Sequence, residues 1–133
     1  STFFNSIHLS RNLFDGKNEL IDDRNVWACA ESDNNPFIQI KFSEPVLVYC
    51  LSITARRSPW NTQAPSYFEI FGIKDNNQEI LLEKFTKSQW IPNEKKIFPF
   101  ENYEPFSIYK IKFRKPTPKS ISLAGLNLGV IKL

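Results

Sequence analysis

Apolar and polar residues alternate over several short segments of this chain, a pattern that is typical of β-strands with one buried face. The segment 107–115 is the clearest case. Its apolar face carries Tyr109, Ile111 and Phe113. Its other face carries Lys110, Lys112 and Arg114. Such a strand belongs to an antiparallel sheet that has one side against the core and one side in water.

The same interpretation predicts a series of strands between turn residues. We expect strands at 37–42, 46–55, 67–74, 79–85, 95–100, 107–115 and 125–133. Ser43–Pro45 is expected to form a turn after the first strand, and Asp75–Asn77 to reverse the chain within a hairpin. About eight strands at this spacing indicate an all-β sandwich or barrel.

The composition agrees with one folded domain. The chain has 133 residues, of which 41% are apolar and 14% aromatic, with twelve phenylalanines. It contains no apolar run of about 18 residues, so no membrane-spanning segment is predicted. The chain has no Met and begins Ser1-Thr2. Removal of a secretory signal peptide explains this start, as does excision from a larger protein, and we expect a secreted or periplasmic protein.

The two cysteines leave two interpretations open. Cys29 and Cys50 could form a disulfide in an oxidising compartment. Two free, packed thiols are the alternative, because Cys50 lies within an apolar segment. A zinc site needs about four ligands, and two Cys with one His do not supply them.

Positive charge is concentrated in the second half of the chain. The net charge is +3, but residues 84–119 hold nine basic and three acidic residues. Solvated strand faces would explain such a run. An anionic partner is the alternative explanation.

The sequence does not indicate an enzyme or a nucleic-acid-binding protein. His8 is the only histidine, and it has no nucleophile motif beside it. The basic region does contain aromatic residues, as single-strand binders do. However, Tyr109 and Phe113 lie on the face that we assign to the core.

The segment 56–63 suits a carbohydrate. Sugars present apolar C–H faces and hydroxyl groups, so a binding site needs an aromatic platform and planar polar side chains. Arg56, Arg57, Trp60 and Asn61 supply both within one loop. The alternative for Trp60 is that its ring folds back onto the core. Trp90 is a second candidate platform, and burial in the core is the alternative for this residue too.

Several segments together resemble a known superfamily. They are Asp15-Gly16, Trp27, the strand 37–42, the segment 63–72 and Ile121–Ala124, in this order. The series resembles the discoidin, or coagulation-factor C-type, galactose-binding-like superfamily, and within it the family 32 carbohydrate-binding modules of bacteria. The resemblance covers nearly the whole chain, and residues 1–133 are expected to form a single domain of this type. It implies a β-sandwich jelly roll that has no catalytic activity and binds ligands through loops at one end.

The resemblance also implies where the ligand and a metal would lie. The ligand loop corresponds to 56–61, with the loops around Trp90 and Lys119 as neighbouring walls. Many members hold a structural calcium ion, and Asp15 matches one of its ligands. The position of a further ligand, a Glu near the C-terminus, falls on Gly125. Since calcium takes about six or more oxygen ligands, no metal is predicted here.

The cationic loops suggest a particular sugar. Members often bind galactose with a pocket His, but His8 lies too early in the chain to match. Arginine pairs bidentately with carboxylate. We therefore expect a galacto-configured or acidic polysaccharide such as polygalacturonate, the pectin backbone. The expected contacts are made by Arg56, Arg57, Trp60, Asn61, Trp90, Lys95 and Lys119.

The alternative function is adhesion. A discoidin-type module would recognise a protein or an anionic lipid surface, and such modules usually expose apolar loop tips. The loops here are mostly polar and cationic. The protein is otherwise expected to be a monomer without a cofactor, without a nucleic-acid partner and without membrane insertion.

Overall fold

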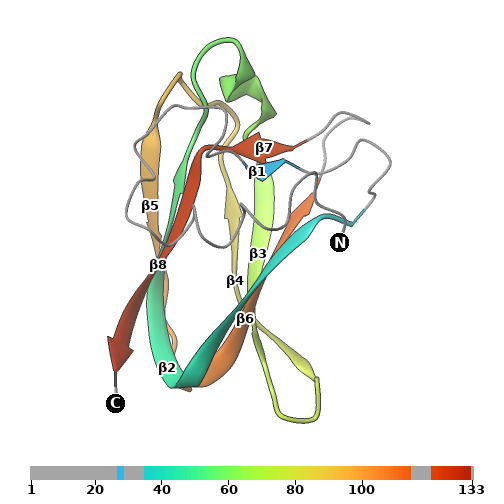
Figure 1. Cartoon of the computed structure of the whole chain (residues 1–133), viewed down its shortest axis with the longest axis vertical. Coiled ribbons are helices and arrows are strands. Elements are labelled where there is room, and N and C mark those ends of the chain that lie inside the picture. The colour runs from blue at the N-terminus through green and yellow to red at the C-terminus, as the bar shows by residue number, and fades with distance from the viewer. Residues whose placement is uncertain (1–26, 29–34, 115–120, 133) are drawn as a thin grey trace.

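The computed structural model describes residues 27–28, 35–114 and 121–132, and all its strand pairs are antiparallel (Figure 1). The elements are β1 (Trp27–Ala28), β2 (Phe37–Thr54), the 3-10 helix η2 (Trp60–Gln63), β3 (Tyr67–Ile73), β4 (Glu79–Thr86), β5 (Lys95–Pro99), β6 (Phe106–Arg114), β7 (Ser122–Leu123) and β8 (Gly125–Lys132). The prediction of an all-β sandwich is confirmed.

Strand β2 joins the two layers of the sandwich. The main sheet has the order β4-β3-β6-β2-β5, and β8 also pairs with β2. The first part of β2 pairs with β6, whereas its second part lies between β8 and β5. Figure 1 shows β2 turning at the lower end of the molecule between these two neighbourhoods. The small β1–β7 ladder lies near the other end.

The prediction of separate strands at 37–42 and 46–55 was wrong, because β2 is one strand of 18 residues. The predicted turn Ser43–Pro45 lies inside it and is exposed. The pairing with β6 shifts register between Lys41 and Val46. Pro45 is tolerated there because this irregular stretch needs no ladder hydrogen bond from its nitrogen.

The core lies between the two layers. In β6, Tyr109, Ile111 and Phe113 are buried, as the alternation predicts. From the facing layer, β2 contributes Leu51 and Ile53, which are also fully buried. The layers meet in an aromatic cluster, in which the rings of Phe68 in β3 and Phe98 in β5 lie edge to face with centroids 5.0 Å apart.

The hairpin predicted at Asp75–Asn77 is confirmed between β3 and β4. Asn77 adopts a φ of 67° and donates its N–H to the Lys74 carbonyl. Asparagine tolerates this left-handed conformation better than most residues. The short elements β1, β7 and η2 were not predicted, because two to four residues carry no recognisable periodicity.

Cys50 is a free, half-buried thiol, and Cys29 lies outside the described residues. For Cys50 the structure therefore supports the alternative of a packed thiol. No helix in the described part of the chain is long and apolar enough to cross a membrane.

The hydroxyl of Tyr109 fixes the bend of β2. This residue is fully buried, and its Oη donates to the Val46 carbonyl at 2.7 Å. The same oxygen accepts the N–H of Val48 at 3.3 Å and the side-chain amide of Asn102 at 3.3 Å. Asn102 also donates to the Val48 carbonyl at 3.1 Å. Backbone groups of Val46 and Val48, where β2 leaves the irregular stretch, are thus bonded by side chains from inside the core.

Replacement of Tyr109 by Phe tests this network. We expect the Tyr109→Phe variant to lose about 1–3 kcal/mol of unfolding free energy, because the Val46 carbonyl loses its buried donor. Denaturant unfolding measures the loss. The control is Tyr103→Phe, since Tyr103 is 85% exposed. Equal unfolding midpoints for the two variants would show that the hydroxyl does not hold the bend.

Candidate functional site

Two loops come together at the end of the sandwich where β2 ends and β5 begins. One loop runs from residue 55 to 66 and contains η2, and the other runs from 87 to 94 (Figure 1). Backbone hydrogen bonds join them: Asn93 donates to the Arg56 carbonyl at 3.1 Å, and Ala55 donates to the Glu94 carbonyl at 2.8 Å. The two loops therefore act as one structural unit.

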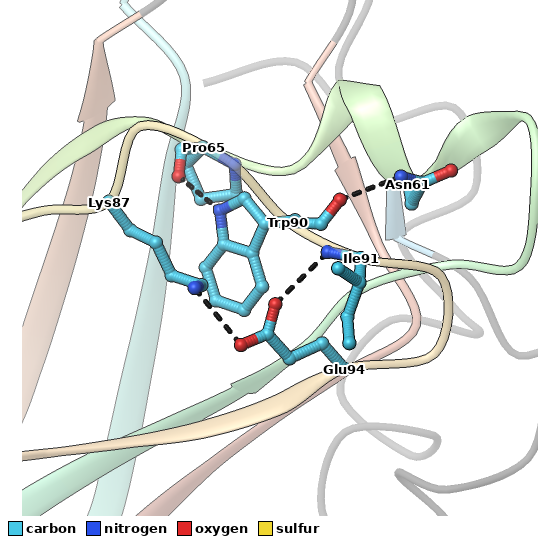
Figure 2. Close-up of polar contacts among 6 residues, drawn as sticks. All are labelled: Asn61, Pro65, Lys87, Trp90, Ile91 and Glu94. Carbon is cyan, nitrogen blue, oxygen red and sulfur yellow. Dashed lines mark hydrogen bonds and ion pairs between the residues drawn. The ribbon is translucent and has the colours of Figure 1, made fainter.

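Trp90 lies beneath this unit rather than on its surface. Only 7% of the residue is exposed, and its indole N–H donates to the Pro65 carbonyl at 2.8 Å (Figure 2). Its ring also packs near Phe98 in the core. The prediction that Trp90 offers a stacking platform needs correction, because a large aromatic ring beside this core gains more from burial than from exposure.

Asn61 links η2 to the second loop. Its side-chain amide donates to the Trp90 carbonyl at 2.7 Å. Figure 2 shows the amide oxygen pointing away from that contact. Asn61 therefore holds η2 against the second loop through its amide nitrogen, while its amide oxygen is directed away from this hydrogen bond.

Glu94 holds the second loop in shape. Its carboxylate accepts the Ile91 N–H at 3.0 Å and pairs with the Lys87 ammonium at 3.0 Å (Figure 2). The Ile91 hydrogen bond, and then the Lys87 charge, hold the pKa of the Glu94 carboxyl below its ordinary value of 4.5. Lys87 also lies 5.0 Å from the centroid of the Trp90 ring. The carboxylate thus connects the loop backbone to the side chain that covers Trp90.

A cleft of about 450 Å³ lies between the two loops. It is lined by Asn61, Thr62, Ala64, Ser66, Ser88, Gln89, Trp90 and Ile91. Its polar groups are uncharged hydroxyls and amides, which both donate and accept hydrogen bonds. Ile91 adds an apolar side chain that is 66% exposed. The cleft can therefore receive a small, hydroxyl-rich molecule that also has an apolar face.

The two predicted arginines lie against Trp60 beside the cleft. Their guanidinium carbons are 4.9 Å (Arg56) and 5.4 Å (Arg57) from the Trp60 ring centroid, within the range of cation–π contacts. Arg56 is half-buried and donates to the Ser122 hydroxyl at 3.3 Å, whereas Arg57 is exposed. Trp60 is half-buried. The structure thus brings Arg56, Arg57 and Trp60 together, but outside the lining of the cleft.

The remaining predicted residues are more distant or not described. Lys95 begins β5 opposite Thr54 and is exposed. Lys119 lies outside the described residues, as do His8 and the calcium candidate Asp15. Gly125, where the resemblance implies a calcium-binding Glu in other members, is buried at the start of β8. Among the residues described, no cluster of three or more His, Cys, Asp or Glu side chains could hold a metal.

Sequence reasoning missed most of the cleft lining. Ser66, Ser88, Gln89 and Ile91 were not singled out, although they stand beside Pro65 or Trp90. Proline and small polar residues do mark loops. However, the pairing of the two loops depends on contacts between residues 29 positions apart, such as Asn61 and Trp90.

The Glu94→Gln variant tests how the second loop is held. We expect a loss of about 1 kcal/mol in unfolding free energy at neutral pH, since a hydrogen bond to a carboxylate and a part-exposed ion pair are lost. Because the folded pKa is lowered, this stabilisation is complete above 4.5. It is lost as the pH falls through the folded pKa. Unfolding measured from neutral to acid pH checks this.

The matched control is Glu44→Gln, which changes an exposed carboxylate in the irregular part of β2. A difference between Glu94→Gln and the unchanged protein that grows on acidification would contradict the role of the Glu94 carboxylate.

Comparisons with known proteins agree on the fold. No family model and no curated protein sequence matches the chain. Among solved structures, it is similar to the family 32 carbohydrate-binding module of Clostridium perfringens NanJ, in complex with galactose. The TM-score is 0.67 and the identity 22%, over 88% of this chain and 81% of that chain.

Two other bacterial modules are similar to the same extent. A Clostridium perfringens family 32 module in complex with GalNAc-β-1,3-galactose has a TM-score of 0.70 and 15% identity, over 90% of this chain and 82% of that one. A Streptococcus pneumoniae fucose-binding module has a TM-score of 0.70 and 18% identity, over 99% and 91%. The chain thus has the β-sandwich fold of the superfamily that its sequence resembles.

Proposed function

We propose that this chain is a non-catalytic carbohydrate-binding module whose ligand lies in the cleft between η2 and the 87–94 loop. One observation carries the proposal: the cleft is lined by hydroxyl and amide side chains next to exposed Ile91. These groups match the hydroxyls and the apolar C–H face of a sugar.

The similar solved structures support this class of ligand. Those modules were solved with galactose and with GalNAc-β-1,3-galactose, and a third is described as fucose-binding. Fold alone does not establish function, so the residues of the cleft itself are what favour a sugar ligand. A small site of this kind would bind one or a few sugar units with micromolar to millimolar dissociation constants.

Within this class we propose a galacto-configured or acidic polysaccharide, such as polygalacturonate. Arg57 and Lys95 are exposed at this end of the sandwich, and Arg57 lies near Trp60 in the segment that continues into Asn61. A sugar in the cleft could therefore extend towards a cationic edge, where a guanidinium would pair with a carboxylate. Secretion or export to the periplasm would bring the module to such a polymer.

One observation favours the second candidate, an adhesion module for an anionic lipid surface. Ile91 exposes 66% of its surface in the 87–94 loop and lines a surface hollow together with Lys87. An apolar side chain beside cations is suited to a membrane interface. A liposome pull-down beside a glycan array separates the two functions.

Substitution of a cleft amide tests the site. We expect Gln89→Ala to weaken binding to a galactan about three- to tenfold, because one or two sugar hydrogen bonds are lost. Isothermal titration measures the dissociation constant. The control Gln78→Ala removes an exposed amide in the β3–β4 turn at the opposite end. Equal affinities of the two variants would place the ligand elsewhere.

The acidic specificity has its own test. Binding to polygalacturonate should weaken strongly as salt rises towards about 1 M, where charge interactions are screened within about 3 Å. Binding to a neutral galactan should change little over this range. Arg57→Ala should weaken only the binding to polygalacturonate. Salt-independent binding to polygalacturonate would overturn the ionic contribution and leave the sugar contacts in place.

A further inference from the structure

The outward face of β6 carries a row of three cations. Lys110, Lys112 and Arg114 occupy alternate positions of the strand, so they project from the same face at intervals of about 7 Å. Their neighbours Tyr109, Ile111 and Phe113 point into the core. The positive charge concentrated in the second half of the sequence thus falls partly on one flat sheet surface rather than only on the loops.

Each of these cations lies against an aromatic ring from a neighbouring strand. The Lys110 ammonium is 4.2 Å from the Phe37 ring centroid, and the Lys112 ammonium is 4.7 Å from that of Phe71. The Arg114 guanidinium is 4.8 Å from the Tyr67 ring centroid. We call these three cations and three rings the β6 face. A ring holds a cation in position without cancelling its charge. Lys110 and Lys112 also share one carboxylate, that of Glu79.

Among the described residues on this side of the sheet, cations outnumber carboxylates. The strand registers place Lys41 and Lys84 on the same side as the β6 face, and both are exposed. The same registers place Glu69 and Glu79 there. Glu79 pairs with both Lys110 and Lys112. Among the described residues that the registers place on this side, five cations therefore share two carboxylates, which leaves a net positive charge.

An ordinary solvated strand face also carries charged side chains. Such a face has no need for three cations at alternate positions that each lie against an aromatic ring. Here, Phe37, Tyr67 and Phe71 are all half-buried on the outward face, and Leu81 beside Phe71 is 44% exposed. Cations already held in position lose little further entropy when a ligand binds. A row of three over about 14 Å suits a linear polymer better than a single anion.

We propose that the β6 face is a second binding surface, which takes an extended uronic-acid polysaccharide. The ammonium and guanidinium groups would pair with its carboxylates, while the ring edges and Leu81 would contact apolar C–H groups of the sugar. The Arg114 end of the row lies at the loop end of the sheet, because its partner Tyr67 directly follows Ser66 in the cleft lining. One polymer could thus extend from the cleft onto the face.

The proposal deepens the proposed function but can fail separately from it, because the two surfaces share no residue. The double variant Lys84→Gln/Arg114→Gln removes one cation of the β6 face and one exposed cation on the same side of the sheet, and it leaves the Glu79 pairs intact. The control Lys74→Gln/Lys96→Gln removes two exposed lysines that are not part of the β6 face. Thermal melting checks that all variants are folded.

Affinity electrophoresis in gels containing polygalacturonate measures binding, with a neutral galactan as the second polymer. We expect the face variant to bind polygalacturonate at least about fivefold more weakly than the control, with a smaller dependence on salt. Binding to galactan should stay unchanged, whereas Gln89→Ala should weaken both. Tyr67→Ala should also weaken binding to polygalacturonate, although it alters no charge.

Equal retardation of the face variant and the control would overturn the proposal without affecting the cleft. Single-stranded DNA and phosphatidylserine vesicles serve as alternative polyanions. Tighter binding of either one than of polygalacturonate would also overturn it, because the surface would then select another class of partner.

Discussion

The bend of β2 around the buried hydroxyl of Tyr109 is the constraint on which the sandwich depends. One strand supplies both layers, so the angle at which it crosses between them sets the position of every strand that pairs with it. The ladder between β2 and β6 shifts register between Lys41 and Val46. Just after this shift, Tyr109 and Asn102 bond the backbone of Val46 and Val48 from inside the core. A single polar network thus determines how the two layers face each other.

The geometry of the candidate site follows from this arrangement. The second part of β2 leads directly into the loop with η2, and β5, which pairs with it, receives the 87–94 loop. The two loops are therefore brought together by strand pairing and are then joined by Asn61 and Glu94. Trp90 fills the space beneath them. These contacts fix the shape of the two loops more firmly than is usual for loops. A fixed shape favours selective binding of a small ligand.

The sequence predicted the regular strands well, because period-2 alternation is a local signal. The segment 107–115 shows it most clearly, and β6 spans Phe106–Arg114. The β2 bend was missed because Ser43 and Pro45 locally resemble a turn, while the Tyr109 bonds that keep the strand continuous come from more than 60 residues away. Among the site residues, Asn61 was predicted to lie at the ligand, and it lines the cleft. Trp90 also lines the cleft, but it is buried rather than an exposed platform, because burial depends on the whole fold. Gln89 was missed because nothing local marks it.

The central claim is that a sugar occupies the cleft between η2 and the 87–94 loop. The most direct test is a titration of the isotope-labelled protein with a galactose-containing oligosaccharide, followed through its backbone amide resonances. If the sugar binds there, the resonances of Asn61, Ser66, Gln89 and Ile91 shift saturably, with little change in the β3–β4 turn at the opposite end. Saturable shifts confined to that turn, or no shifts with any galacto-configured sugar, would contradict the claim.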